Sequence, residues 1–299
     1  MSLALLWIPS TIAAAAAQTA RNAMQHQLTA EIGTLGATQV RFLYGFPFAL
    51  VFLAAISLAG GSLPPTPNSK FLAYIAWGAL TQILATALML AAMREKSFAL
   101  TITYIKTEAL QVALFGFLFL RDPLTSGSLL AILTTTIGVI AMTWKPAARQ
   151  SLMDWRPMLL GIGSGAMFAL SSVGYRGSIL ALESGSFLMR ASTSVTWGLA
   201  LQSLLLLVWL GLFQREALVG SLRVWRYSLF AGFMGALASQ FWFLGFALTT
   251  AANVRTLGLV EVLFAQIVSR RLAQRSTGQE RIGMALVVLG VLCLLWFAQ

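Results

Sequence analysis

Four charged residues lie inside stretches that are otherwise apolar. Lys106 and Glu108 lie in TYIKTEALQ, and Arg255 and Glu261 lie in NVRTLGLVE. A charged side chain at the centre of a bilayer costs about 2.5 to 3.5 kcal/mol on insertion scales, so such residues normally face a bundle interior and have a partner. Two cations and two carboxylates together can bind both the carboxylate and the ammonium group of a zwitterion. These four residues are therefore candidates for binding a small-molecule substrate.

A structural role for the same residues is the alternative. Lys106 would then pair with Glu108 or Glu261, and Arg255 with the remaining carboxylate, only to hold the helices together. Arg255 also lies about one turn into its predicted helix, from which it could extend to the membrane interface. The sequence leaves these pairings open.

Further polar and aromatic residues within the predicted spans could line a cavity. Tyr104, Glu108 and Gln111 are spaced by four and three residues, so they share one helix face. The other candidates for substrate binding are amides and mid-span aromatic residues, namely Gln18, Gln82, Gln240, Tyr44, Trp197 and Trp242. Amides can instead join helices by hydrogen bonds, and aromatic rings can simply pack between them. The glycine-rich string GIGSGA at 161–166 has no preceding strand, so it predicts close helix packing and not a nucleotide loop.

The composition indicates the class of protein. Of 299 residues, 58% are hydrophobic and 10% are charged, whereas soluble domains carry about 25% charged residues. The net charge of +11 comes from short clusters between apolar runs, which is typical of membrane-protein loops and not of a nucleic-acid site. With one cysteine, Cys293, one histidine, His26, and two separated aspartates, we expect no disulfide, metal site or cofactor and no enzyme activity.

Ten segments have the length and hydrophobicity of membrane-spanning helices. They cover 3–24, 35–59, 71–93, 97–120, 126–144, 158–180, 186–213, 225–247, 251–272 and 279–298. Runs such as LVFLAAISLAG do not alternate as barrel strands would, so we predict an all-α integral membrane protein. Pro9 and Pro47 are expected to kink the first two helices.

The two halves of the chain resemble each other weakly across a polar linker at 145–157. The matched residues are Thr125, Gly138, Val139 and Trp144, which recur 152 residues later as Thr277, Gly290, Val291 and Trp296. Five helices is an odd number, so the second copy would enter the membrane from the opposite side. We therefore predict two inverted five-helix repeats, 1–144 and 158–299, around a central cavity, which is a transporter architecture.

The ends of the two halves, LFGFLFLRDPLTSGSLLAILTTTIGVIAM and EVLFAQIVSRRLAQRSTGQERIGMALVVLGV, resemble the drug/metabolite transporter superfamily in its ten-helix, EamA-type form. Asp122 stands where that family usually has Glu, and Glu261 stands where proline is common, so helix nine is expected to bend less. The chain looks most similar to the amino-acid exporters, including the aromatic amino-acid (YddG-like) branch. This resemblance implies a multi-pass transporter of the bacterial inner membrane that exports amino acids by alternating access.

Other functions and the orientation stay open at this point. Export of drugs or other metabolites is the nearest alternative, followed by a channel or scramblase and a polytopic membrane enzyme. Glu108 or Glu261 could carry a coupling proton, although a facilitated carrier needs none. Fourteen Lys and Arg residues on the odd-numbered loops, against five on the other side, place both termini outside the cell, whereas the resemblance implies cytoplasmic termini.

Overall fold

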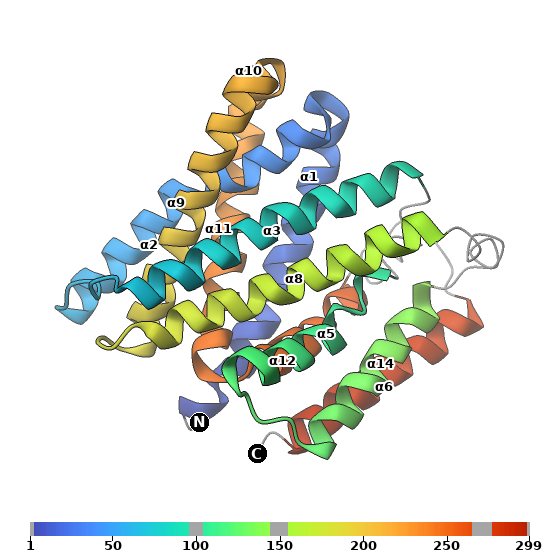
Figure 1. Cartoon of the computed structure of the whole chain (residues 1–299). Coiled ribbons are helices and arrows are strands. Elements are labelled where there is room, and N and C mark those ends of the chain that lie inside the picture. The colour runs from blue at the N-terminus through green and yellow to red at the C-terminus, as the bar shows by residue number, and fades with distance from the viewer. Residues whose placement is uncertain (1–2, 96–103, 144–154, 265–276, 298–299) are drawn as a thin grey trace. The chain divides into compact units, whose positions relative to one another are not determined.

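The computed structural model describes residues 3–95, 104–143, 155–264 and 277–297, and every regular element in these ranges is helical (Figure 1). Parts of the predicted segments 97–120 and 251–272, and most of the predicted linker 145–157, lie outside the described residues.

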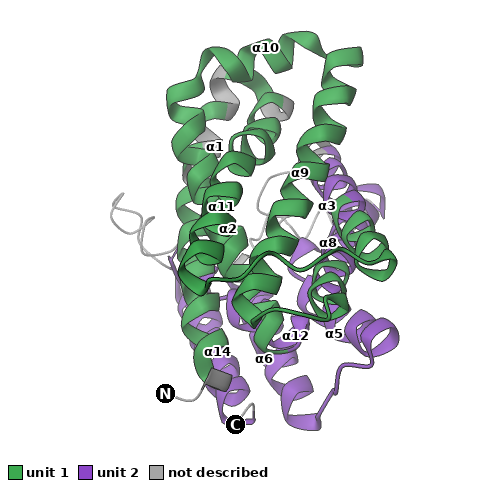
Figure 2. Ribbon diagram, turned by 90° about the vertical axis from the view of Figure 1, so that its left-hand side faces the viewer, with its two compact units in different colours: residues 1–79, 174–249 green, residues 80–173, 250–299 purple. Residues whose placement is uncertain are grey.

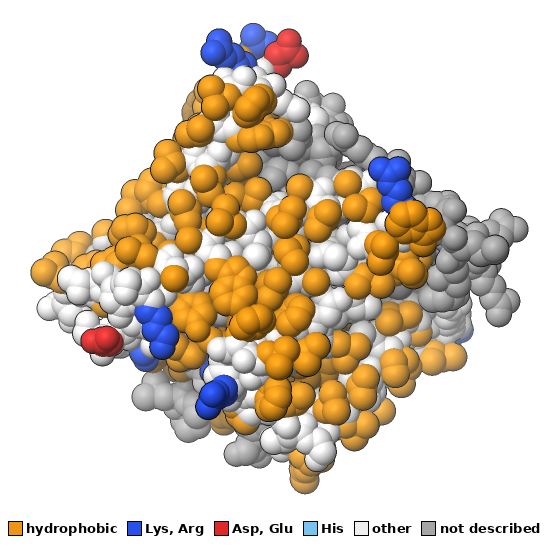
Figure 3. All heavy atoms as spheres, viewed as in Figure 1, with side chains coloured by type: hydrophobic (Ala, Val, Ile, Leu, Met, Phe, Trp, Pro, Cys, Tyr) orange, Lys and Arg blue, Asp and Glu red, His pale blue; other side chains and the backbone are white. Residues whose placement is uncertain are grey.

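Six described segments are long and apolar enough to cross a membrane. They are Gly36–Gly60, Ser69–Met89, Trp155–Ala181, Phe187–Phe213, Trp225–Leu248 and Gly278–Phe297. Hydrophobic side chains cover much of the visible surface, and Lys and Arg side chains occupy only a few places on it (Figure 3). The prediction of an all-α, multi-pass membrane protein is thus confirmed at this level.

The helices fall into two compact units (Figure 2). Unit 1 comprises Met1–Ala79 and Gly174–Thr249. Its elements are the 3₁₀ turn η1 (Leu3–Leu6), α1 (Trp7–Leu43), α2 (Gly45–Gly60), the first part of α3 (Ser69–Glu95), the end of α8 (Trp155–Ala181), α9 (Phe187–Phe213), α10 (Arg215–Arg223) and α11 (Trp225–Leu248).

Unit 2 comprises Leu80–Val173 and Thr250–Gln299. It contains the remainder of α3 and α8, together with α5 (Glu108–Phe115), the π-helical turn η2 (Gly116–Leu120), α6 (Ser126–Thr143), α12 (Ala251–Gly258) and α14 (Gly278–Phe297). Each unit takes residues from both sides of the linker. The units describe contacts and not sequence duplication, so the predicted repeat boundaries stay a prediction.

Glycines allow close helix approach within unit 1. A Cβ on Gly174 of α8 would lie 2.9 Å from the Cα of Gly78 in α3, and a Cβ on Gly78 would lie 2.8 Å from the Tyr175 ring. Small residues at helix contacts are the usual means by which membrane helices pack, because dispersion forces act only at short range.

The contact between α6 and α14 in unit 2 has a regular pattern. A Cβ on Gly138 would lie 2.7 Å from the backbone N of Val287, and one on Gly290 would lie 2.7 Å from the backbone N of Thr135. Both glycines occupy matched positions of the two halves, 152 residues apart, and so do Thr135 and Val287. The two contacts are therefore equivalent: each becomes the other when the roles of α6 and α14 are exchanged.

The predicted break between the first two segments, at 25–34, is shorter than expected. α1 consists of two helices that meet at a kink at Gly33, whose dihedrals, φ 71° and ψ 171°, are non-helical. This φ favours glycine, which has no Cβ to clash. The polar residues indicated where the helix is broken, but helical structure extends further on both sides of Gly33 than the segments 3–24 and 35–59 predicted.

The two prolines that were expected to kink helices differ in position. Pro9 is the third residue of α1, where the missing proline N–H has no intrahelical partner in any case. Pro47 is the third residue of α2 but lies inside the span Gly36–Gly60, in which Tyr44 separates α1 from α2. Because proline cannot donate to the carbonyl of Leu43, four residues earlier, this interruption lies where a kink at Pro47 is expected. A further difference is α10, a short helix within a range that the sequence indicated as a loop.

Candidate functional site

The helical path of the fourth predicted segment changes just before Glu108. The N–H of Thr107 donates to the carbonyl of Tyr104 at 3.3 Å, and the N–H of Leu110 donates to the carbonyl of Thr107 at 3.1 Å. The Thr107 hydroxyl also donates to the Tyr104 carbonyl, at 2.7 Å. These bonds span three residues and not four, so the helix tightens locally at Lys106 and Thr107 before α5 begins at Glu108.

A similar change occurs before Glu261 in the ninth segment. α12 ends at Gly258, the N–H of Leu259 donates to the Thr256 carbonyl at 3.1 Å, and helical structure resumes at Glu261. The interruption is present although glutamate stands where the resemblance implied proline. The start of α12 is fixed by Thr250, whose hydroxyl accepts from the N–H of Asn253 at 3.2 Å.

These interruptions place three of the four charges where the backbone dipoles favour them. Glu108 begins α5, and Glu261 begins the helical residues after the second interruption. Arg255 lies in the last turn of α12. Carboxylates are stabilised at helix N-termini and cations at C-termini, each typically by about 0.3 to 1 kcal/mol.

The four charges form two crossed ion pairs. Lys106 Nζ contacts Glu261 Oε1, and Arg255 Nε lies 3.2 Å from Glu108 Oε1. Their side chains are 15 to 16% exposed. Each cation thus pairs with the carboxylate from the other half of the chain, a pairing that the sequence left open.

Ser172 of α8 holds Arg255 in place. Arg255 Nε donates to Ser172 Oγ at 2.8 Å, and the Ser172 hydroxyl donates to the carbonyl of Phe168 at 3.0 Å. Ser172 is fully buried. Sequence analysis missed this residue, because one serine among several in an apolar helix carries no spacing signal that links it to a distant arginine.

Glycines of α8 admit the interrupted segment. A Cβ on Gly165 would lie 3.0 Å from the carbonyl of Ile105, and one on Gly161 would lie 3.1 Å from the ring of Tyr104. The prediction that GIGSGA serves close helix packing is confirmed. Gln111 completes this region, because its Nε2 donates to Thr107 Oγ1 at 3.1 Å and to the Ile162 carbonyl at 3.4 Å.

Seven of the twelve predicted site residues therefore lie in unit 2. They are Tyr104, Lys106, Glu108, Gln111, Arg255, Glu261 and, on α3, the buried Gln82. All but Gln82 belong to the two interrupted segments, where Tyr104 and Gln111 lie within three residues of an ion-pair residue in sequence.

The other five lie in unit 1 and make separate contacts. Trp242 Nε1 donates to Gln18 Oε1 at 3.1 Å, and Gln240 Nε2 donates to Ser192 Oγ at 2.7 Å. Both bonds join neighbouring helices, as amides in membrane spans often do.

Two aromatic candidates in unit 1 have different surroundings. The Tyr44 hydroxyl donates to the carbonyl of Ser221 at 3.2 Å. Trp197 is 43% exposed, and its ring meets that of Phe71 edge-on with centroids 6.1 Å apart. Their roles in substrate binding stay predictions.

Among the described residues, no group of three or more His, Cys, Asp or Glu side chains is placed to hold a metal ion. The chemistry of the unit 2 cluster is that of four fixed charges and their hydrogen-bond donors and acceptors. Such a cluster can bind ions and polar groups of both signs.

Comparison with known proteins supports the fold. No family model and no curated protein matches the chain. A solved structure described only as "Crystal structure of protein" is similar to it, with a TM-score of 0.70 and 16% sequence identity over 99% of both chains. At this identity, the likeness shows a shared fold alone.

Proposed function

We propose that this protein is a secondary transporter that moves amino acids or related zwitterions across the membrane. The observation that carries the proposal is the pair of crossed ion pairs, Lys106 with Glu261 and Arg255 with Glu108, placed where two helical segments are interrupted. Interrupted helices near the middle of the membrane are a recurring means of binding substrates and ions in transporters, because they free backbone groups and helix ends inside the protein.

The charges suit a zwitterion because they balance. A substrate carboxylate can take the place of Glu108 beside Arg255, or of Glu261 beside Lys106, and a substrate ammonium can bind the carboxylate that is released. Each protein charge of the opened pair then keeps a partner of opposite sign. A lone cation or anion would leave one protein charge without a partner, which is costly at low dielectric.

We further propose that the chain has ten membrane helices in two inverted repeats and belongs with the drug/metabolite transporters of the bacterial inner membrane. The equivalent contacts of Gly138 with Val287 and of Gly290 with Thr135 support this repeat. A two-fold axis between α6 and α14 produces this exchange of contacts. Alternating access would then follow from rearrangement of the two halves.

Aromatic and neutral amino acids are the substrates that the resemblance favours, and export is the direction it implies. Drugs or other metabolites are the second candidate class. The balanced cluster favours zwitterions over them, because lipophilic cations would be bound better by an unpaired carboxylate. Proton coupling through Glu108 or Glu261 is compatible with either class.

The test is flux in proteoliposomes that are loaded with a radiolabelled amino-acid mixture, with and without a pH gradient. We expect saturable, stereoselective flux by the wild type and its loss in Lys106→Gln. Lys70→Gln, which removes a cation at the exposed start of α3, is the matched control and should keep wild-type flux.

Each outcome of the flux assay has a definite meaning. Dependence of flux on the pH gradient would add proton coupling to the proposal. Non-saturable flux would identify a channel or scramblase. Wild-type flux in a folded Lys106→Gln variant would make the ion pairs structural, and absence of amino-acid flux would favour drugs or other metabolites.

A further inference from the structure

The hairpin that joins α9 to α11 carries several cations beside exposed apolar residues. Arg215 and Arg223 begin and end α10, and Arg226 follows in α11. Glu216 is the one acidic residue between Phe213 and Tyr227. Figure 3 shows basic and acidic side chains gathered at the end where Figure 1 labels α10. The hairpin therefore has a positive balance.

Apolar side chains share the same surface of α10. Val219 and Leu222 are 45% and 51% exposed, and they lie four and seven residues after Arg215, on one helix face. Arg223 is next to Leu222 and four residues beyond Val219. A helix with exposed apolar residues between two arginines is typical of the boundary between lipid headgroups and acyl chains.

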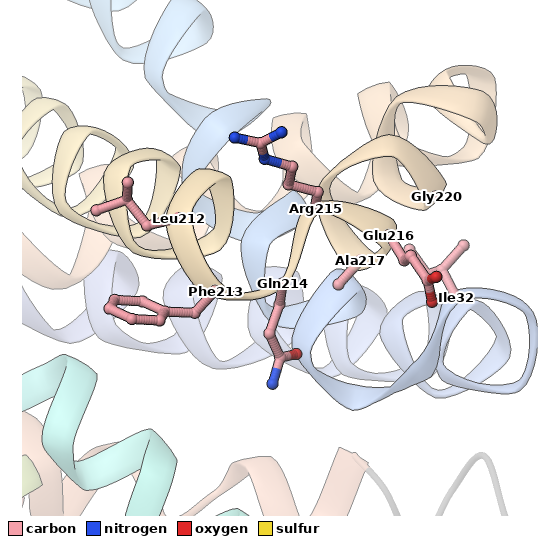
Figure 4. Close-up of a pocket in the computed structure, with 8 residues that line it drawn as sticks. All are labelled: Ile32, Leu212, Phe213, Gln214, Arg215, Glu216, Ala217 and Gly220. Atoms are coloured by element: carbon pink, nitrogen blue, oxygen red, sulfur yellow. The ribbon is translucent and has the colours of Figure 1, made fainter.

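A cavity of about 770 Å³ opens at this hairpin. Its lining combines Leu212, Phe213 and Ile32 with the polar Gln214, Arg215 and Glu216, completed by Ala217 and Gly220. In Figure 4, Leu212 and Phe213 lie on one side, Ile32 and Glu216 on the other, and Gln214 and Arg215 between them. The cavity thus presents apolar and charged surfaces side by side.

The arginines keep hydrogen-bond donors available. Arg215 Nε donates to the carbonyl of Gly211 at 2.9 Å, at the end of α9. Its Nη groups make no hydrogen bond within the described residues. The Arg226 guanidinium lies 5.5 Å from the centre of the Trp225 ring, and that ring is itself exposed. Guanidinium groups with free donors bind phosphate oxygens in pairs.

We propose that this hairpin binds an anionic phospholipid, with the phosphate beside Arg215 at the cavity, an acyl chain against Leu212, Phe213 and Ile32, and Arg223 at the other end of α10 adding to the positive charge. The charge balance selects an anionic headgroup over a zwitterionic one, and the apolar half of the cavity selects a lipid over a free phosphate ion. This site is separate from the ion pairs of unit 2. It requires only that the protein lies in a membrane, so it does not depend on transport.

The experiment measures lipid retention by the full-length protein in detergent micelles. Equal mole fractions of phosphatidylglycerol, phosphatidylethanolamine and phosphatidylcholine are added, and bound lipids are counted by native mass spectrometry. The variants are Arg215→Gln/Arg223→Gln and the charge-retaining Arg215→Lys/Arg223→Lys. The matched control is Arg156→Gln, which removes an exposed arginine next to the exposed Trp155 at the start of α8.

We expect the wild type to retain phosphatidylglycerol in preference to both zwitterionic lipids. A basic residue at a membrane surface contributes about fivefold to the binding of anionic lipid, so the double glutamine variant should lose at least that factor of preference. The double lysine variant should keep most of it, and Arg156→Gln should keep all of it. Size-exclusion profiles of the variants verify that each is folded.

Three results would overturn the proposal. The first is equal retention of the three lipids by the wild type. The second is an equal loss of preference in Arg156→Gln and in the double glutamine variant. The third is displacement of the lipid by millimolar inorganic phosphate, which would identify a free anion as the ligand.

Discussion

Arg255 Nε lies 3.2 Å from Glu108 Oε1, although the two residues belong to opposite halves of the sequence. The contact links the start of α5 to the last turn of α12. Lys106 and Glu261 make the second such link. Because each pair takes one member from each half, any movement that separates the two interrupted segments must break both pairs or replace them with a ligand.

The Arg255 and Glu108 pair can be tested by a double-mutant cycle. Arg255→Gln leaves Glu108 without its cation, and we expect a loss of about 1 to 3 kcal/mol in the free energy of unfolding. This is less than the 3 to 5 kcal/mol of a fully buried pair because both side chains are 16% exposed. Arg255→Gln/Glu108→Gln should recover at least half of that loss. Unfolding in detergent measures each value, and additive losses would mean that the pair is not coupled.

We expect Ser172 to affect stability and transport only through its hydrogen bond with Arg255. Ser172→Ala removes the acceptor of the 2.8 Å bond from Arg255, which should cost about 1.5 to 3 kcal/mol in stability. In the flux assay we expect a higher KM for substrate with a smaller change in kcat.

The neighbouring serine provides the control for Ser172. Ser171 is also fully buried, and its hydroxyl makes no hydrogen bond within the described residues. Ser171→Ala should therefore leave stability and KM near wild-type values. Equal effects of the two substitutions would show that the hydroxyl of Ser172 does not position Arg255.

The contact between α6 and α14 predicts matched effects at two glycines. Gly138→Ala and Gly290→Ala each place a methyl group 2.7 Å from a backbone nitrogen of the facing helix. Overpacking of this kind costs about 1 to 3 kcal/mol. Thermal unfolding should show similar losses for both variants, as a two-fold contact requires.

Gly211 in α9 is the control for this pair. A Cβ there would meet no atom within 4 Å, so Gly211→Ala should be neutral or stabilise the helix by up to about 1 kcal/mol. A large loss for only one of Gly138→Ala and Gly290→Ala would argue against the symmetric packing.

Trp242 and Trp197 should differ in their contributions to stability and to flux. Trp242→Phe removes the donor of the 3.1 Å bond to Gln18 and should cost about 1 kcal/mol in stability. Trp197→Phe keeps a ring against Phe71 at an exposed position and should change stability by less than about 0.5 kcal/mol. In the flux assay, we expect lower flux from Trp242→Phe and wild-type flux from Trp197→Phe. The reverse order would assign the substrate contact to Trp197.

The sequence by itself determined the class of the protein and identified the four charged residues that form the ion pairs in unit 2. Long apolar runs can satisfy their backbone hydrogen bonds in a membrane only as helices, so composition and segment length were enough to predict an all-α membrane protein. Charged residues are rare in such runs because their desolvation is costly. For this reason Lys106, Glu108, Arg255 and Glu261 could be identified without a structure.

The ends and kinks of the helices were harder to predict from the sequence. Polar residues at 25–34 indicated a ten-residue break, yet the structure has only a kink at Gly33 there. The effect of a proline depends on the turn that it occupies. Pro9 lies in the first turn of α1, where proline is tolerated, whereas Pro47 follows the interruption at Tyr44 inside the span Gly36–Gly60.

Only the tertiary structure decided which charges pair and what holds them. Lys106 could reach either carboxylate by spacing alone, and the choice of Glu261 depends on how α5 and α12 approach each other. Ser172 became visible only once α8 lay beside Arg255. A buried charge can be recognised in a sequence because its desolvation cost depends on the apolar segment in which it lies. The partner that offsets this cost comes from a distant part of the chain, so only the tertiary structure identifies it.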